Sequence, residues 1–445
     1  MQPLVKSSIP SLSLRGRGTA FAREYLLSVL GQGVEVGALE IIEGDSVVVL
    51  GKIQETKRPA RIVVKNDTVW WRIFTSSDLG FAESYMLGEF ETDDLRAICD
   101  IWINNASRLE GLSTVFFQAF ALGYKYTSAL FGQSVSRAKL NAVAGYDGSN
   151  AMFQAFLSKE MMYSCALWTD AEGGLNGDLQ SERDLLELEA AQKRKIRHVL
   201  TKARVKRGDR VLEFGSGWCG LAIEAVQWLG CTVDTLTLSV EQKKLGEERI
   251  RAAGLEDSIH VHLLDYRQLP PSFEKAFDAF VSVEMIEHVG PTHYEKYFSL
   301  IDWALKSKNA AAVITSSTCS EAKYTTYQTP DFSRYYMWPN GTLPSATALV
   351  QAANAGSKGR LQLDEIENHG QHYARTLREW NRRFLRFVPE IEEEIMEQHP
   401  AFKTDRKLFE AFKRKWLYLF PSAEAGFASG YLTCHMLTFI REMTL

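Results

Sequence analysis

The regular alternation of short apolar segments with charged, helix-like segments after residue 205 limits the possible folds of this chain more than any other feature. The apolar segments have the length and composition of buried strands, and they lie at 210–214, 232–238, 259–264, 279–283 and 310–315. Helical patterns separate them, at 222–229, 241–253 and 292–305, and a charged helix at about 180–205 precedes them. Strands joined by helices form parallel βαβ units. We therefore expect an α/β domain around a mainly parallel, twisted sheet.

The amino-terminal part has a different pattern. Residues 34–75 favour short strands, with β-rich runs at 47–50 and 61–64. The pattern becomes helical from Leu79, and the pair Asp93-Asp94 provides an N-cap before the apolar stripe that begins at Leu95. Because 445 residues exceed one ordinary domain, we predict a smaller α+β domain over 1–135 and a larger α/β domain over 136–445.

Composition excludes several classes of function. The net charge of −4 has no basic excess, so no nucleic-acid partner is expected. The six cysteines form no C-x-x-C pair, which favours a reducing, cytoplasmic setting over a disulfide framework. His260 and His262 lack further ligands nearby, and no metal is expected. Polar residues interrupt the apolar stretch 112–131, which is either a buried helix or a segment lying at a membrane surface.

The segment Val-Leu-Glu-Phe-Gly-Ser-Gly-Trp-Cys-Gly at 211–220 is a strand that enters a glycine-rich turn. In open α/β sheets this first strand-to-helix turn is where a nucleotide-like ligand binds. Glu213 stands at the strand end, and Gly215, Gly217 and Gly220 allow a ligand to approach the main chain. This differs from the G-x-G-x-x-G dinucleotide pattern and is typical of S-adenosylmethionine sites, in which the carboxylate meets the amino group of the methionine part. The alternative is a tight turn without a ligand.

The ends of the next two predicted strands support this interpretation. Thr237, Leu238 and Gln242 belong to the segment that closes the second strand, where a ribose would lie, and Asp265 and Tyr266 follow the third strand, at a plausible adenine edge. Each of these residues alone is equally compatible with a helix cap or a loop hydrogen bond.

Several motifs together resemble those of the cyclopropane fatty acid synthase family. They are Tyr-Ser-Cys-Ala-Leu-Trp at 163–168, the glycine turn at 212–220, Leu-Thr-Leu-Ser-Val-Glu-Gln at 236–242, Ser-Val-Glu-Met-Ile-Glu-His-Val-Gly at 282–290, Trp-Pro-Asn-Gly-Thr-Leu-Pro-Ser at 338–345 and Glu-Asn-His-Gly-Gln-His-Tyr at 367–373. The resemblance implies a Rossmann-like class I methyltransferase domain with S-adenosylmethionine as donor. It also implies unsaturated phospholipid acyl chains as acceptor, a peripheral position at the membrane, and a homodimer as one assembly option.

The same resemblance assigns roles to single residues. It implies that Cys165, Glu287 and Tyr373 are catalytic and hold a bicarbonate ion, the candidate second ligand, which acts as the base of ring closure. It also implies that Tyr163 and Ser164 join the donor-binding residues named above. Taken singly, each of the three catalytic candidates is more often a core or capping residue.

The chain departs from the family pattern at several positions. Thr315 and Ser316 stand where the family usually has His or Gln, Ala423 replaces a Cys, Gly145 replaces a His, and Ser216 and Cys219 replace a Cys and a Gly. Two alternatives therefore stay open. One is N- or C-methylation of another hydrophobic small molecule without ring closure, and the other is a protein that binds donor or acyl chain without catalysis.

Overall fold

The computed structural model describes residues 14–53, 58–112, 140, 148–179, 187–328 and 331–442. The chain divides into two compact units. One unit consists of Met1–Gly145 with Lys407–Tyr418, and the other consists of Tyr146–Arg406 with Leu419–Leu445. The predicted domain boundary at 135/136 lies outside the described residues and stays a prediction. The assignment of Lys407–Tyr418 to the first unit was not foreseen from the sequence.

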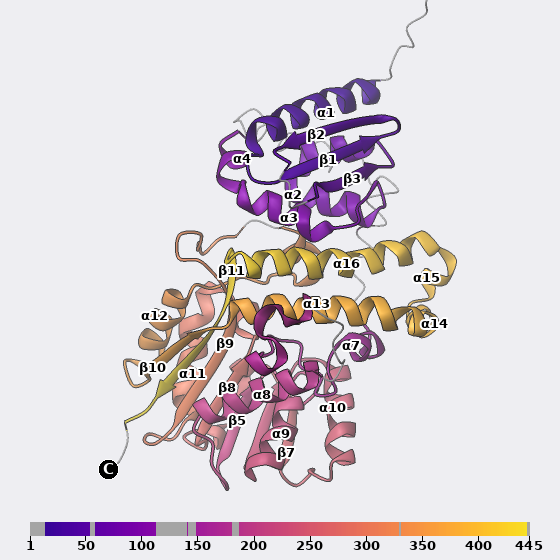
Figure 1. Cartoon of the computed structure of the whole chain (residues 1–445). Helices are drawn as coiled ribbons and strands as arrows, with labels where there is room; N and C mark the ends of the chain where they lie inside the picture. Colours follow the sequence, from indigo (N-terminus) through magenta and orange to yellow (C-terminus); the bar gives the residue numbers. More distant parts are fainter. Residues whose placement is uncertain are drawn as a thin grey trace, which may run out of the picture. The chain divides into compact units, whose positions relative to one another are not determined.

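The second unit is built on a seven-stranded sheet with strand order β10-β11-β9-β8-β5-β6-β7 (Figure 1). The strands are β5 (Arg210–Phe214), β6 (Thr232–Thr237), β7 (Ile259–Leu263), β8 (Ala279–Val283), β9 (Ala311–Cys319), β10 (Gln362–Asn368) and β11 (Leu432–Ile440). β7, β6, β5, β8 and β9 pair in parallel, and β11 runs antiparallel between β9 and β10. The strand order reverses between β5 and β8, which creates a topological switch point at their carboxyl ends. This mainly parallel sheet confirms the predicted fold class.

Helices cover both faces of this sheet. α8 (Glu187–Lys202), α9 (Gly220–Leu229) and α10 (Val240–Ala252) contribute to one core cluster, which includes Val211 of β5. α11 (Tyr294–Ala304) and α12 (Ala346–Ser357) contribute to the other, which includes the next residue, Leu212. Neighbouring residues of one strand point to opposite faces, so a sheet covered on both faces requires the continuous apolar runs seen in the sequence.

The described residues after Tyr146 form further helices, and all of them belong to the second unit except Lys407–Tyr418 of α16. They are α7 (Asn150–Phe156), α13 (Gly370–Phe387), α14 (Glu392–Gln398), α15 (Pro400–Thr404), α16 (Arg406–Ala428), the short helices η1 (Asp170–Glu172), η2 (Gly174–Leu179), η3 (Tyr266–Gln268), η4 (Pro271–Phe273), η5 (Ile286–His288), η6 (Pro291–His293) and η8 (Val388–Ile391), and the π-helical turn η7 (Ser333–Met337). Ion pairs hold α13 in place. Arg375, Arg378 and Arg383 pair with Glu187, Asp178 and Glu189 at 2.7–2.8 Å.

The first unit combines a four-stranded sheet with helices. The sheet order is β2-β1-β3-β4. Its strands are β1 (Ala38–Glu43), β2 (Ser46–Gly51), β3 (Ala60–Val64) and β4 (Phe90–Glu91), and its helices are α1 (Leu14–Gly33), α2 (Thr68–Met86), α3 (Leu95–Asn104) and α4 (Ala106–Leu112). Ile41, Ile62, Trp70 and Phe74 lie in its core. The side chain of Asp94 accepts a hydrogen bond from the Ala97 amide at 2.8 Å, so the predicted cap of α3 is present and Asp94 is the residue of the pair that forms it.

Some local predictions were wrong. The strand pattern was extended to residue 75, whereas α2 already begins at Thr68. Trp70 and Phe74 are four residues apart and both buried, so core packing outweighs the β-preference of their side chains. Two strands, β10 and β11, were missed. For β10 the reason is that it is a polar, largely exposed edge strand without an apolar run.

The interpretation of stretch 112–131 falls on residues of which nearly all lie outside the described ranges, and so does Gly145. Of the helices in the described ranges, none combines the length and apolarity that crossing a bilayer requires.

Candidate functional site

The glycine turn after β5 faces open space at the switch point. Gly215 and Gly217 have φ angles of 87° and 48°, which glycine adopts without strain. A Cβ atom at Gly217 would meet no atom within 4 Å. The amides of Gly215 and Ser216 donate to the Leu236 carbonyl at 3.1 and 2.8 Å, which fixes the turn on β6. The turn can therefore receive a ligand against its main chain.

Gly220 serves packing. A Cβ atom there would lie 2.0 Å from the carbonyl oxygen of Glu160, a separation that no side chain allows. Gly220 thus lets the start of α9 lie directly against the segment that leads to Tyr163. Its predicted part in donor binding stays a prediction.

Glu213 is the penultimate residue of β5, and its side chain is buried beside the turn. Its Oε2 accepts a hydrogen bond from Thr235 Oγ1 at 2.6 Å. Burial raises the pKa of Glu213 to about 8. A cationic partner would relieve the cost of charging this carboxyl group. The site therefore fits the ammonium group of S-adenosylmethionine.

The other donor-binding candidates lie after β6 and β7, on the same sheet edge. Thr237 Oγ1 donates to Gln242 Oε1 at 2.9 Å, and Leu238 is 72% exposed. Asp265 accepts a hydrogen bond from the Arg267 amide at 2.8 Å, and the ring of Tyr266 lies 5.8 Å from that of Phe214. These bonds fix the loops at the crevice, and the donor contacts of the five candidates stay predictions.

Glu284, which the sequence analysis did not select, lies at the centre of the site. It follows β8 directly and has a φ of 50°, in a region that non-glycine residues seldom occupy. Its Oε1 accepts a hydrogen bond from the Cys165 amide at 2.8 Å, and its Oε2 accepts one from the Tyr373 hydroxyl at 2.6 Å. Two of the three predicted catalytic residues thus meet on Glu284. An acid directly after a predicted strand was the signal that could have identified it.

The third candidate, Glu287, lies on η5 and turns toward β9. Its Oε1 accepts a hydrogen bond from the Ser317 amide at 2.6 Å, and its Oε2 is buried without a partner among the described residues. Burial, reinforced by the charge of Glu284, raises the pKa of Glu287 to about 8. A carboxyl group with such a pKa is largely protonated at neutral pH and can act as a hydrogen-bond donor.

The segment with Tyr163, Ser164 and Cys165 contacts both α8 and α13. Lys195 Nζ of α8 donates to Ser164 Oγ at 2.6 Å. The Cys165 thiol donates to the His369 carbonyl at 3.6 Å. The ring of Tyr163 lies 5.2 Å from that of Trp380. Burial lowers the pKa of Lys195 to about 8, an effect opposed first by the charge of Glu284.

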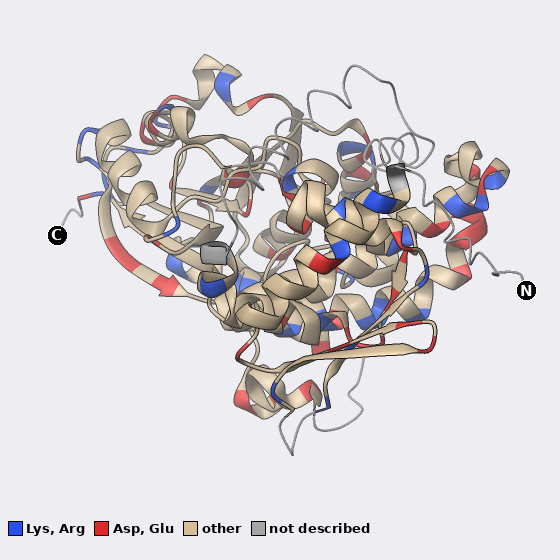
Figure 2. Cartoon of the chain, turned by 90° about the horizontal axis from the view of Figure 1, so that it is seen from above, with Lys and Arg blue, Asp and Glu red and all other residues tan. Residues whose placement is uncertain are grey.

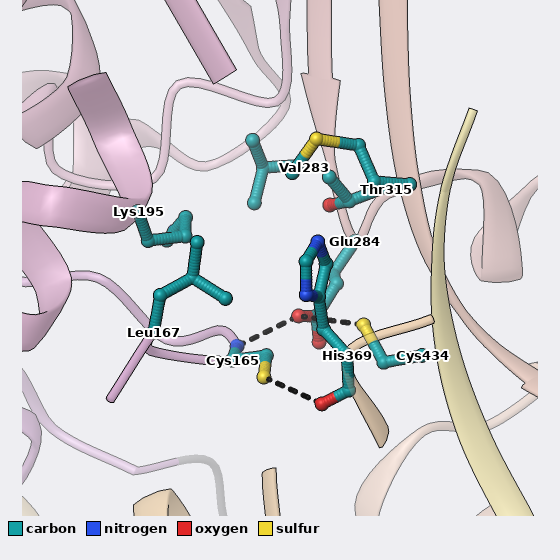
Figure 3. A pocket seen from close by; sticks show the side chains of 9 residues that line it. Cys165, Leu167, Lys195, Val283, Glu284, Thr315, His369 and Cys434 are labelled. Atoms are coloured by element: carbon teal, nitrogen blue, oxygen red, sulfur yellow. Dashed lines mark hydrogen bonds between the residues drawn. The ribbon is translucent and has the colours of Figure 1, made fainter. Parts of the chain in front are cut away.

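A small pocket lies between Cys165, Lys195 and Glu284. Figure 3 shows its lining, which consists of Cys165, Leu167, Lys195, Val283, Glu284, Thr315, His369, Cys434 and Met436. Cys434 was not predicted, and its Sγ lies 3.9 Å from Glu284 Oε1. Leu167, Val283 and Met436 give the pocket an apolar wall beside the carboxylate. Such a lining suits an apolar reacting group that needs a base or an anion nearby.

Bicarbonate does not fit the residues expected to hold it. The Cys165 amide and the Tyr373 hydroxyl already donate to Glu284. A second anion among these groups would stand beside the Glu284 carboxylate, and like charges repel strongly when buried. The structure thus provides a carboxylate of its own where a bound anion was expected.

One cluster of metal-ligand type occurs among the described residues. His198, Glu367 and His369 have candidate ligand atoms within 4.8 Å of one another. His198 Nε2 lies 2.9 Å from Glu367 Oε2, and Lys202 Nζ lies 3.5 Å from Glu367 Oε1. These groups balance Glu367 without an ion, and the absence of a metal stays a prediction.

Comparison with known proteins identifies the family of this chain. The family model described as mycolic acid cyclopropane synthetase matches residues 133–436. The chain belongs to the mycolic acid cyclopropane synthetase family. It is thus an S-adenosylmethionine-dependent methyltransferase of a lipid-modifying family.

Two curated family members cover most of the chain. The cyclopropane-fatty-acyl-phospholipid synthase of Escherichia coli is 32% identical over 385 residues, which span 86% of this chain and 88% of that protein. The tuberculostearic acid methyltransferase UfaA1 of Mycobacterium tuberculosis is 31% identical over 388 residues, which span 87% of this chain and 84% of that protein. The two names describe different products, so family membership alone does not fix the product.

Solved structures agree on the fold. The cyclopropane synthase MmaA2 from Mycobacterium tuberculosis has a TM-score of 0.53 at 23% identity, over 68% of this chain and 97% of that protein. Coclaurine N-methyltransferase has a TM-score of 0.59 at 16% identity, over 81% of this chain and 98% of that protein.

Proposed function

We propose that this enzyme transfers a methylene carbon from S-adenosylmethionine to the cis double bond of an unsaturated phospholipid acyl chain and closes a cyclopropane ring. The observation that carries the proposal is the pocket in which a buried carboxylate, Glu284, lies against the apolar side chains of Leu167, Val283 and Met436. An alkene needs an apolar surround, whereas ring closure needs a base, and this pocket offers both.

The pocket also adjoins the donor turn. A Cβ atom at Gly215 would lie 3.2 Å from the Cβ of Met285, the residue after Glu284. When bound, the donor supplies an electrophilic sulfonium methyl group. The chain's own residues then have three tasks: to hold the alkene in line with that methyl group, to exclude water, and to accept a proton.

The acceptor assignment is supported by the phospholipid synthase of Escherichia coli, which is similar over most of the chain. We propose a peripheral position at the cytoplasmic membrane surface because the acceptor is a membrane lipid. A second candidate is methylation of an acyl chain without ring closure. The similarity to the tuberculostearic acid methyltransferase and the hydroxyl residues Thr315 and Ser316 at the usual His or Gln position favour it.

The test is incubation of the full chain with methyl-labelled donor and vesicles of dioleoyl phospholipid, followed by mass spectrometry of the lipids. Cyclopropanation predicts a gain of one CH2 per modified chain with loss of the double bond. A gain of CH2 with a double bond retained supports the second candidate. Vesicles with saturated chains serve as the acceptor control, and Glu213→Gln serves as the donor-site control. Label in soluble amines or phenols, with none in lipid, would refute the proposed acceptor.

A further inference from the structure

We propose that Glu284 is the general base of this reaction, so that the enzyme closes the ring with its own carboxylate and needs no bound bicarbonate. The inference rests on the proposed function and names the residue that receives the proton. It goes beyond the motif resemblance, which points to Cys165, Glu287 and Tyr373 and leaves position 284 unassigned.

The backbone directs Glu284 into the pocket. The residue directly follows β8 at the switch point, and its amide donates to the Thr315 carbonyl of the adjacent β9 at 3.0 Å. Its φ of 50° is a conformation that glycine adopts without strain but a side chain seldom does. Strained backbone at a buried carboxylate has to be held by its surroundings, and such strain gathers at functional sites.

Three donors hold the carboxylate without using all of its acceptor capacity, and the weakest of them is the Cys434 thiol, whose Sγ lies 3.9 Å from Oε1. The Cys165 amide binds Oε1, and the Tyr373 hydroxyl binds Oε2. Each carboxylate oxygen can accept two hydrogen bonds. Among the described residues, Tyr373 is the hydrogen-bond donor recorded for Oε2, so this oxygen keeps an acceptor site for a substrate proton. Figure 3 shows the carboxylate lying between Cys165 and Cys434 in the pocket.

The surrounding charges suit a base that also faces a carbocation. Burial raises the pKa of Glu284, and the bonds from Tyr373 and Cys165 and the charge of Lys195 act in the opposite direction. The group is therefore more basic than an exposed carboxylate. In a buried site its negative charge also stabilises a cation formed nearby.

The step balances without a further reactant. The alkene π pair forms the new carbon–carbon bond to the methyl group as the S–CH3 bond breaks and its electron pair goes to sulfur. The acyl chain is left with a carbocation beside the new methyl branch. Glu284 then takes one proton from that branch, and the electrons of the broken C–H bond form the third ring bond. The proton stays on the Glu284 carboxyl group and is released to water after the product leaves.

The experiment compares the wild-type chain, Glu284→Gln, Glu284→Gly and the exposed control Glu274→Gln on dioleoyl phospholipid vesicles. Each is assayed in buffer freed of CO2, with and without added bicarbonate or formate. We expect wild-type turnover to change by less than about twofold with bicarbonate. Glu284→Gln should lower kcat by about 10²- to 10⁴-fold, the usual effect of losing a general base, with donor affinity retained. Glu274→Gln should match wild type.

Glu284→Gly separates a chemical from a structural role. Glycine relaxes the positive φ and leaves space in the pocket, so added formate or bicarbonate should restore part of the lost activity. A residue that only supported the Cys165 segment would show no rescue by small carboxylates. Donor titration of each variant confirms folding.

The experiment distinguishes failure of this inference from failure of the proposed function. If wild-type activity requires bicarbonate, or if Glu284→Gln stays within about fivefold of wild type, Glu284 is not the base although the proposed function stands. If the wild-type chain modifies no lipid, the proposed function fails and this inference fails with it.

Discussion

At the residue scale, burial determines the protonation of the groups on which the site depends. Glu213, Glu287 and Lys195 all have a pKa shifted to about 8, in each case with burial as the largest cause. Burial penalises the charged form of acids and bases alike, so acids titrate higher and lysines lower. The binding of a charged ligand should therefore change the protonation of these groups, and their protonation should change the affinity for the ligand.

We predict that donor affinity rises with pH. Below about pH 8 the free protein holds a proton on Glu213, and this proton must leave before the carboxylate can pair with the donor ammonium. Affinity for S-adenosylhomocysteine should therefore increase up to about tenfold per pH unit between about pH 6.5 and 7.5 and then level off. Calorimetric titration at several pH values measures this.

Glu213→Gln should remove most of the pH dependence and weaken binding by about 10-fold or more, as expected for a lost charged hydrogen bond. The exposed variant Glu274→Gln is the control and should follow the wild-type curve. A wild-type affinity that is flat over this range would contradict the assignment of Glu213.

At the element scale, three adjacent strands and one loop build the site. β5 provides Glu213 and leads into the glycine turn, Glu284 directly follows β8, and the middle of β9 provides Thr315. The 163–168 segment joins them because its backbone and its tryptophan bind α13. The Ala166 amide donates to Thr376 Oγ1 at 3.1 Å, and the Trp168 indole donates to the His372 carbonyl at 3.1 Å.

The close contact between α9 and this segment leads to a prediction about stability. Gly220→Ala would place a Cβ atom 2.0 Å from the Glu160 carbonyl, so one backbone must move. We expect the free energy of unfolding to fall by about 1–3 kcal/mol, as for other overpacked sites, together with weaker donor binding. Urea unfolding and donor titration measure the two effects.

Gly31→Ala is the matched control. Gly31 lies in α1, where the nearest atom to an added Cβ is 3.9 Å away, and alanine favours a helix. This variant should be neutral or more stable by up to about 1 kcal/mol. Equal losses in the two variants would show that the contact at Gly220 is unimportant.

At the scale of the whole molecule, opposite charges are mixed. The chain has 51 Lys and Arg against 55 Asp and Glu. Figure 2 shows basic and acidic positions interspersed along the helices of the described part. This charge balance does not indicate a basic surface that would attract anionic lipids.

We therefore predict that turnover on vesicles depends little on membrane charge. Replacing part of a zwitterionic phospholipid by an anionic one with the same acyl chains should change the initial rate by less than about threefold, and so should raising NaCl from about 0.1 to about 0.5 M. Initial rates with labelled donor measure both. A rate that collapses at high salt would point instead to a basic lipid-binding surface.

The amino-acid sequence by itself determined the features that depend on neighbouring residues. The alternation of strands and helices, the glycine turn with Glu213, and the cap at Asp94 are local patterns, and the structure has each of them. The motif resemblance led to the correct family and donor. β10 was missed because a polar edge strand gains its pairing from β11 rather than from its own composition.

The tertiary structure decided which groups meet. Cys165 and Glu284 are 119 residues apart, and Tyr373 is 89 residues beyond Glu284. Cys165 and Tyr373 nevertheless each donate a hydrogen bond to the Glu284 carboxylate. Such a contact depends on how a strand end, a loop and a helix pack, and no local pattern encodes that packing. Glu284 was one acid among 55 acidic residues in the sequence. Burial beside an apolar wall is what makes it a candidate base.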